Sequence, residues 1–151
     1  MIKTNSFFRI LIVEDNMPRA NLLKSWLPID IKPVLVTSAG AAIGLIKRDR
    51  GNVYAGIMLD HDLQENIVSR ADMDLNGMNV VDAIVSYIPN DVPILVHSTN
   101  ETQGPAMARR LESYNYMVMQ ISMNQLTYRK FLEWIEEVRE LWEDLQEDDE
   151  I

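Results

Sequence analysis

Short apolar runs alternate along the chain with longer segments in which apolar positions recur every three or four residues. The runs occupy residues 8–13, 34–36, 53–59, 92–96 and 116–121. Short runs that are nearly continuous in apolar side chains are typical of strands buried on both faces of a parallel sheet. The sequence therefore predicts five strands.

The segments between these runs, and the one after the last, carry helical patterns. Their apolar positions are Leu22, Leu23, Trp26 and Leu27; Ala42, Leu45 and Ile46; Met78, Val81, Ile84, Val85 and Ile88; Met107, Leu111 and Tyr114; and Phe131, Trp134, Ile135, Val138, Leu141, Trp142 and Leu145. Asn16 and Ser38 can cap the first two helices, and Pro18 occupies a first-turn position. Five strands alternating with five helices predict one doubly wound α/β domain.

Composition narrows the functional classes. The chain has 151 residues, no cysteine and a net charge of −9. Without cysteine it can form neither a disulfide nor a thiolate metal site. No apolar run approaches the ~20 residues that span a bilayer, and the first residues lack the pattern of a secretory signal. We therefore expect a cytoplasmic protein that does not engage a membrane.

The negative charge is concentrated at the C-terminal end. Residues 131–151 contain ten acids and one base, whereas residues 1–130 contain 13 residues of each sign. This segment should not bind nucleic acid, because phosphate contacts need Lys and Arg. We expect a domain over residues 1–145 and a frayed acidic tail over 146–151. The apolar stripe of the last helix either lies wholly in the core or leaves a part exposed as a homodimer interface.

Three of the predicted strands end in polar side chains. Glu14 and Asp15 follow the first strand, Asp60 the third, and Ser98 and Thr99 the fourth. Ligands of open parallel sheets bind at the carboxyl ends of the strands, so these side chains converge if the first and third strands are neighbours. Clustered carboxylates repel one another, and Mg²⁺, which prefers oxygen ligands, relieves this repulsion. The alternative is that they are ordinary loop residues that cap helices.

With these residues in this order, the chain resembles the receiver domain of bacterial response regulators over about residues 8–142. The matching motifs are Ile-Leu-Ile-Val-Glu-Asp-Asn at residues 10–16, Asp60 at the end of the third strand and Ser98 at the end of the fourth. The resemblance implies a flavodoxin-like fold, with a five-stranded parallel sheet of order 2-1-3-4-5 and five helices.

The resemblance also implies a role for each residue of the candidate site. Glu14 and Asp15 would bind Mg²⁺, and the backbone carbonyl of Asp62 would add a further metal ligand. Asp60 would contact the metal and act as the nucleophile that accepts a phosphoryl group. Ser98 would then turn inward to bond that group. A divalent ion makes this chemistry feasible, because it screens the charges of the carboxylate and the phosphate.

The chain departs from the receiver pattern at two places. Receivers carry a Lys at the end of strand five, where this chain has Gln120, a neutral amide that cannot screen an aspartyl phosphate as an ammonium does. The loop after Asp60 is longer than in receivers, and the glycine expected soon after it comes only at Gly77. This loop is either a surface insertion or a lid that brings Arg70 to a bound phosphate.

Both histidines flank the candidate site. His61 follows Asp60, and His97 precedes Ser98, although strand alternation turns His97 toward the helix layer. The strings Leu-Asp-His-Asp-Leu at residues 59–63 and His-Ser-Thr-Asn at 97–100 resemble the cyclic-phosphate-processing receiver-like family. That resemblance implies metal-dependent hydrolysis of a small cyclic phosphate, for example on an ADP-ribose-derived nucleotide.

In this hydrolase, the catalytic residues would be Asp60, His61 and Ser98, with His61 donating a proton to the leaving oxygen. The phosphate contacts would come from Ser98, Thr99, Asn100 and Gln120. Three hypotheses therefore stand. The chain is a stand-alone receiver that signals in a phosphorelay through a regulatory protein partner, a hydrolase of a small phosphoester in the same pocket, or a pseudo-receiver that only binds proteins.

Overall fold

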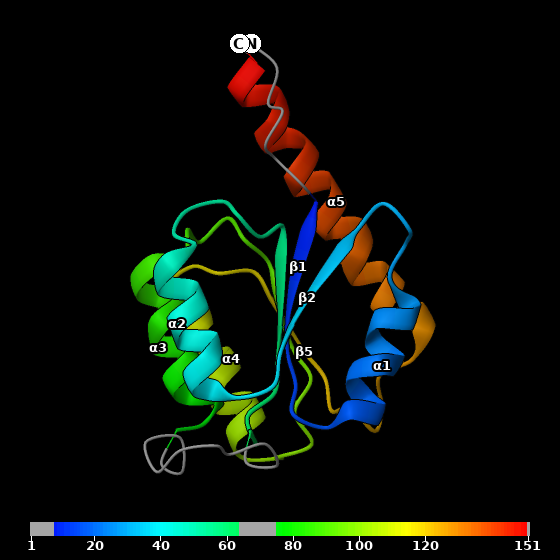
Figure 1. The fold of residues 1–151 in the computed structure, drawn as a ribbon, viewed down its shortest axis with the longest axis vertical. Coiled ribbons are helices and arrows are strands. Elements are labelled where there is room, and N and C mark those ends of the chain that lie inside the picture. Colours follow the sequence, from blue (N-terminus) through cyan, green and yellow to red (C-terminus); the bar gives the residue numbers. More distant parts are fainter. Residues whose placement is uncertain (1–7, 64–74, 151) are drawn as a thin grey trace.

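The computed structural model describes residues 8–63 and 75–150 and, for residues 147–150, the backbone alone. The strands are β1 (Arg9–Val13), β2 (Lys32–Val36), β3 (Gly56–Leu59), β4 (Ile94–Val96) and β5 (Val118–Gln120). The helices are α1 (Met17–Trp26), α2 (Ala39–Arg48), α3 (Gly77–Tyr87), α4 (Gln103–Ser113) and α5 (Tyr128–Glu150). This alternation confirms the predicted α/β class (Figure 1).

The five strands form one parallel sheet in the order β2-β1-β3-β4-β5, as the flavodoxin-like resemblance implies. Helices α2, α3 and α4 cover one face of the sheet, and α1 and α5 cover the other (Figure 1). The order places β1 and β3 side by side at the centre of the sheet. The residues that follow these two strands are therefore neighbours at the carboxyl edge.

Strand β1 shows why its sequence is continuously apolar. Leu11 and Val13 point into the core beneath α2, α3 and α4, whereas Ile10 and Ile12 point into the core beneath α1 and α5. All four side chains are fully buried. A central parallel strand has no solvent face, so successive residues are apolar even though they alternate in direction.

The ends of the strands differ from the prediction for reasons of packing and pairing. Strand β2 begins earlier, at Lys32, because Lys32 pairs with Arg9 of β1 at the edge of the sheet. Strand β3 begins later, at Gly56. There the indole of Trp134, which belongs to α5, lies only 3.0 Å from where a Cβ would stand. The ring therefore fills the space that a side chain at this position would need.

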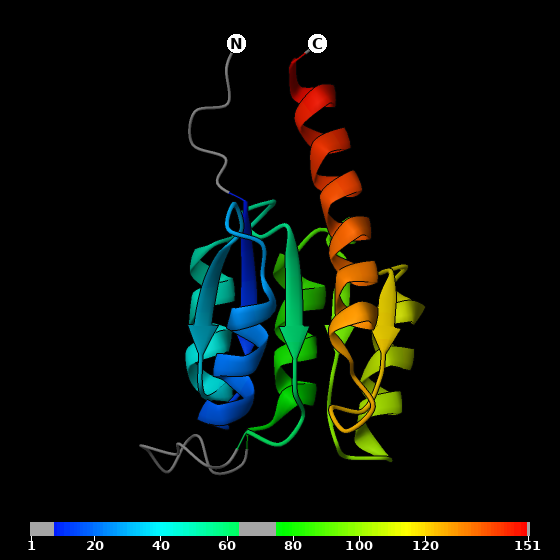
Figure 2. The same ribbon diagram turned by 90° about the vertical axis from the view of Figure 1, so that its right-hand side faces the viewer.

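Helix α5 continues past residue 145, the expected end of the domain, as far as Glu150. Glu, Leu and Gln have high helix propensity, and they extend the helix past its last contacts with the sheet. Figure 2 shows this end of α5 projecting beyond the amino ends of the strands. Most of the apolar stripe is core: Phe131, Trp134, Ile135, Val138 and Trp142 are buried within the chain. None of the described helices is both long and apolar enough to cross a membrane.

Candidate functional site

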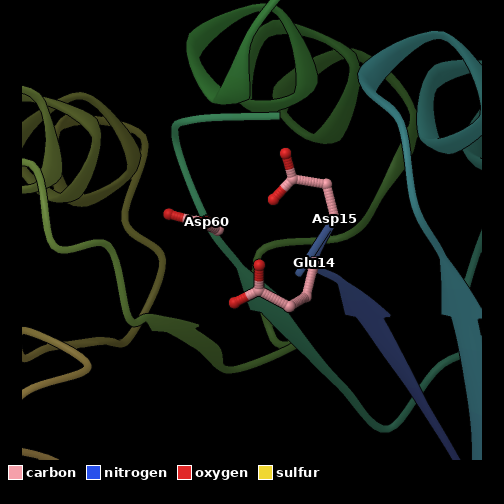
Figure 3. A group of neighbouring side chains, drawn as sticks. All are labelled: Glu14, Asp15 and Asp60. Carbon is pink, nitrogen blue, oxygen red and sulfur yellow. The ribbon is translucent and has the colours of Figure 1, made fainter. Parts of the chain in front are cut away.

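Three carboxylates meet at the carboxyl edge of the sheet. Glu14 and Asp15 follow β1, and Asp60 follows β3 (Figure 3). One oxygen from each lies within 4.8 Å of the others, and all three side chains are buried. The predicted convergence is thus confirmed, and the spacing suits a single small cation with oxygen ligands.

Backbone pairing holds these residues in place beyond the ends of the regular strands. The amide of Glu14 donates to the carbonyl of Val36 at 3.1 Å, and the amide of Asp60 donates to the carbonyl of Val13 at 3.1 Å. Asp60 Oδ1 also accepts from the His61 amide at 2.8 Å. The carboxylates therefore sit on an extension of the sheet, and a rigid sheet edge positions side chains more accurately than a free loop does.

Burial and mutual repulsion perturb the acids. Burial, reinforced by the charge of Asp60, raises the pKa of Glu14 to about 8. Burial also raises the pKa of Asp60, against the lowering effect of the Arg19 charge and of neighbouring polar groups that include Ser98 and the His61 amide. Such shifts are typical of a site that a bound cation would stabilise, since a cation favours the ionised forms of the carboxyl groups.

Arg19, which the sequence analysis did not single out, lies in this cluster. Its Nε is 3.2 Å from Glu14 Oε1, and its Nη2 is 3.7 Å from Asp60 Oδ2. The residue stands in the first turn of α1, because Asn16 caps that helix by accepting from the Arg19 amide at 3.0 Å. The signal that could have identified it is a cation one helical turn after an acidic pair at the end of a strand.

His97 lies beside the acidic cluster and is completely buried. Its Nδ1 is 3.7 Å from Glu14 Oε1, and within the described part of the chain neither ring nitrogen makes a hydrogen bond. Burial, with the nearby charge of Arg19, lowers the pKa of His97 to about 3, so the ring is neutral at physiological pH. His97 therefore stands as a neutral ring beside Glu14, out of contact with solvent.

His61 belongs to a polar network that joins two loops of the site. Its Nδ1 lies 2.7 Å from Asp62 Oδ1, and the same oxygen accepts from Asn100 Nδ2 at 3.4 Å. The carboxylate thus fixes the orientation of the imidazole and leaves its Nε2 available. Asn100 also caps α4 by accepting from the Gln103 amide at 2.8 Å.

Gly77 lies beside the site in space. Although it is distant from Asp60 along the chain, its amide donates to the carbonyl of His61 at 2.8 Å. A Cβ at this position would stand 2.5 Å from the carbonyl oxygen of Asp60 and 2.6 Å from the Cα of His61. Gly77 therefore packs directly against the site, although the insertion separates it from Asp60 along the chain. The proposed lid residue Arg70 is outside the described residues.

Ser98 and Gln120 lie side by side at the ends of β4 and β5. Gln120 pairs with Val96, the last residue of β4, so it ends β5 at the position expected for the missing Lys. Ser98 is buried, and its hydroxyl accepts from the Asn100 amide at 3.0 Å. Thr99 is partly exposed beside them. The end of β5 therefore supplies a neutral amide to the site.

Comparison with known proteins identifies similar domains. The sequence profile of the family described as "Cyclic-phosphate processing Receiver domain" matches residues 9–113, more than half of the chain. No protein with a curated description is significantly similar.

Several solved structures share the fold. A CheY-like response regulator receiver domain protein from Methanospirillum hungatei is 17% identical with a TM-score of 0.66, and the match covers 95% of this chain and 99% of that one. The non-phosphorylated HemR receiver domain from Leptospira biflexa is 24% identical with a TM-score of 0.65, over 87% of this chain and 93% of that one. The response regulator domain of Thermotoga maritima CheB is 19% identical with a TM-score of 0.62, over 90% and 96%.

Proposed function

Because this chain belongs to the family of cyclic-phosphate processing receiver domains, we propose that it hydrolyses a small cyclic phosphate with the help of a divalent cation. One observation carries the proposal. The buried carboxylates of Glu14, Asp15 and Asp60 converge at the sheet edge, whereas the end of β5 provides the neutral Gln120. The site therefore has carboxylates that could hold a cation, without the ammonium that would stabilise an aspartyl phosphate.

The residues present fit Mg²⁺. Buried carboxylate oxygens are the ligands this ion prefers, and Glu14 Oε1 is buried with Arg19 Nε at 3.2 Å but without a hydrogen bond from any described residue. Glu14, Asp15 and Asp60 would hold the ion, with the backbone carbonyl of Asp62 as a further ligand. When bound, such an ion polarises a phosphate and lowers the pKa of water.

The side chains around the acids have separate tasks. Asp60 orients the attacking water and accepts one of its protons, and the water oxygen bonds to phosphorus while one P–O bond of the ring breaks. His61, held through its Nδ1 by Asp62, gives a proton from Nε2 to the departing oxygen, so the product is a phosphomonoester. The guanidinium of Arg19 screens negative charge on the bound phosphate, which the neutral side chain of Gln120 cannot do. Ser98 and Asn100 donate hydrogen bonds to phosphate oxygens, with Thr99 beside them.

A second candidate function is phosphoryl acceptance on Asp60, with output through a regulatory protein partner. The observation that favours it is that Ser98 lies close enough to Asp60 to lower the pKa of that carboxyl, because these are the two side chains that a receiver uses to form and sense an aspartyl phosphate.

Phosphorus NMR tests the proposed hydrolysis. The full chain is incubated with 2′,3′-cyclic nucleotides and Mg²⁺, and the signal of the cyclic phosphate should give way to that of a phosphomonoester. EDTA and Asp60→Asn should abolish the conversion, whereas Asp91→Asn, a matched change at an exposed acid, should not. Intact-mass analysis with a small phosphodonor tests the second function. A phosphoryl-sized mass gain that needs Asp60, with no hydrolysis of any cyclic phosphate, would overturn the first proposal.

A further inference from the structure

A polar cavity adjoins the acidic site between the carboxyl ends of β4 and β5. Its volume is about 490 Å³, within the ~300–1,000 Å³ typical of small-molecule sites. Ser98 belongs to both places, because its side chain lines the cavity and lies close enough to Asp60 to lower the pKa of that carboxyl. A ligand whose phosphate lies at Asp60 can therefore extend past Ser98 into this cavity.

Carboxamide side chains dominate the lining of the cavity. They are those of Asn100, Gln120, Asn124 and Gln125, and the last three are exposed to solvent. A carboxamide presents a donor and an acceptor side by side, which is the pattern that pairs with the edge of a nucleobase. The Asn100 carboxamide is already bonded to Asp62 and to the cap of α4, and the other three favour a ligand with several neutral hydrogen-bonding groups.

The remaining lining residues determine which ligand charge the cavity can accommodate. Pro105 and Ile121 add apolar surface against which a flat ring can pack, and Glu101 adds a negative charge. Among the described residues that line the cavity, none is Lys, Arg or His. A second phosphate placed here would lie near a carboxylate without a cation, which is electrostatically unfavourable.

We propose that this cavity binds the nucleoside part of a nucleotide that carries one phosphate, so that the substrate is a cyclic mononucleotide. The inference rests on the proposed function, since it places the phosphate of the ligand at Asp60. It favours cyclic mononucleotides over ADP-ribose derivatives, whose diphosphate would bring further negative charge beside Glu101.

Calorimetric titration of the full chain in Mg²⁺ tests the cavity. The probes are nucleoside 3′-monophosphates, glycerol phosphate and ADP-ribose, because none of them contains a cyclic phosphate to be turned over. The nucleotides should bind more tightly than the other two. Asn124→Ala and Gln125→Ala should each weaken nucleotide binding about fivefold, the value of one net hydrogen bond. The control is Asn52→Ala, which changes an exposed amide at the amino end of the sheet.

Gly104→Ala offers an independent variant. A Cβ there would lie 3.5 Å from the Cβ of Ser98 and 3.6 Å from Nε2 of Gln120, which is ordinary contact, so the fold should be retained. The added methyl group would contact both of these lining residues, and nucleotide binding should weaken while the melting temperature does not fall.

The outcomes separate this inference from the proposed function. If glycerol phosphate binds as tightly as the nucleotides, or if none of the three cavity variants weakens nucleotide binding, the cavity assignment is wrong, and hydrolysis of a base-free cyclic phosphate would still support the proposed function. If the variants weaken nucleotide binding but no cyclic phosphate is hydrolysed, the cavity assignment stands and the hydrolase proposal fails.

Discussion

Substituting Glu14 with Gln tests the electrostatics of the acidic cluster in the metal-free protein. Glu14 is completely buried, with Asp60, Arg19 and His97 around it. The substitution keeps the shape of the side chain and removes its charge. We expect Glu14→Gln to remove a pH dependence of stability that the wild-type protein shows just above neutral pH.

The sign follows from the two shifted pKa values. The pKa of Glu14 is raised from 4.5 to about 8, so the stability it contributes below pH 4.5 is lost as pH rises toward 8. The pKa of His97 is lowered from 6.5 to about 3, so stability increases with pH up to 6.5. The two effects oppose each other below pH 6.5, and only the loss from Glu14 continues above it.

The magnitude follows from this interval. Between pH 6.5 and about 8, one group that remains protonated only in the folded state costs about 1.4 kcal/mol per pH unit, or about 2 kcal/mol in all. Asp60, whose pKa is also raised, changes stability in the same direction.

Urea unfolding in EDTA at pH 6.5 and at pH 8 measures this difference. The wild type should lose about 2 kcal/mol of unfolding free energy between the two values, and Glu14→Gln should lose much less. Glu137→Gln, a matched change at an exposed acid of α5, should behave as the wild type does. The same loss in Glu14→Gln as in the wild type would refute the reasoning, because another group would then be titrating.

Three further predictions concern the same edge of the sheet. Gly77→Ala should lower the unfolding free energy by about 1–3 kcal/mol in urea unfolding, because its Cβ would meet backbone atoms at 2.5 and 2.6 Å; an unchanged midpoint would contradict this packing. Saturating Mg²⁺, at about 100 times its Kd, should stabilise the wild type by about 2.7 kcal/mol, and Asp15→Asn should lose most of this gain in a thermal shift assay. Arg19→Gln should slow the proposed hydrolysis by about 100-fold, and an unaltered rate would show that its guanidinium does not reach the phosphate.

The alternation of apolar runs and helical patterns was sufficient to predict the class of fold. Each central strand is buried on both faces, so its residues are apolar whatever the details of packing, and Leu11 and Ile12 show this equally. The polar residues that end these runs are conspicuous for the same reason. Glu14, Asp15 and Asp60 could therefore be identified in advance.

The contacts that cross between elements could not be predicted in this way. Gly77 comes much later after Asp60 than the glycine of typical receivers, and distance along the chain says nothing about where an insertion leads the backbone. The roles of the two histidines were likewise open. Only the structure shows that His61 contacts Asp62 and that His97 is buried behind Glu14.

The sequence by itself thus determined the elements and the acids at their ends, because burial on two faces and the period of each element are local properties of the chain. The tertiary structure decided that Arg19 lies among the acids and that carboxamides from two loops surround one cavity. These features depend on how separate elements come together at the sheet edge, and no single segment of the sequence contains that information.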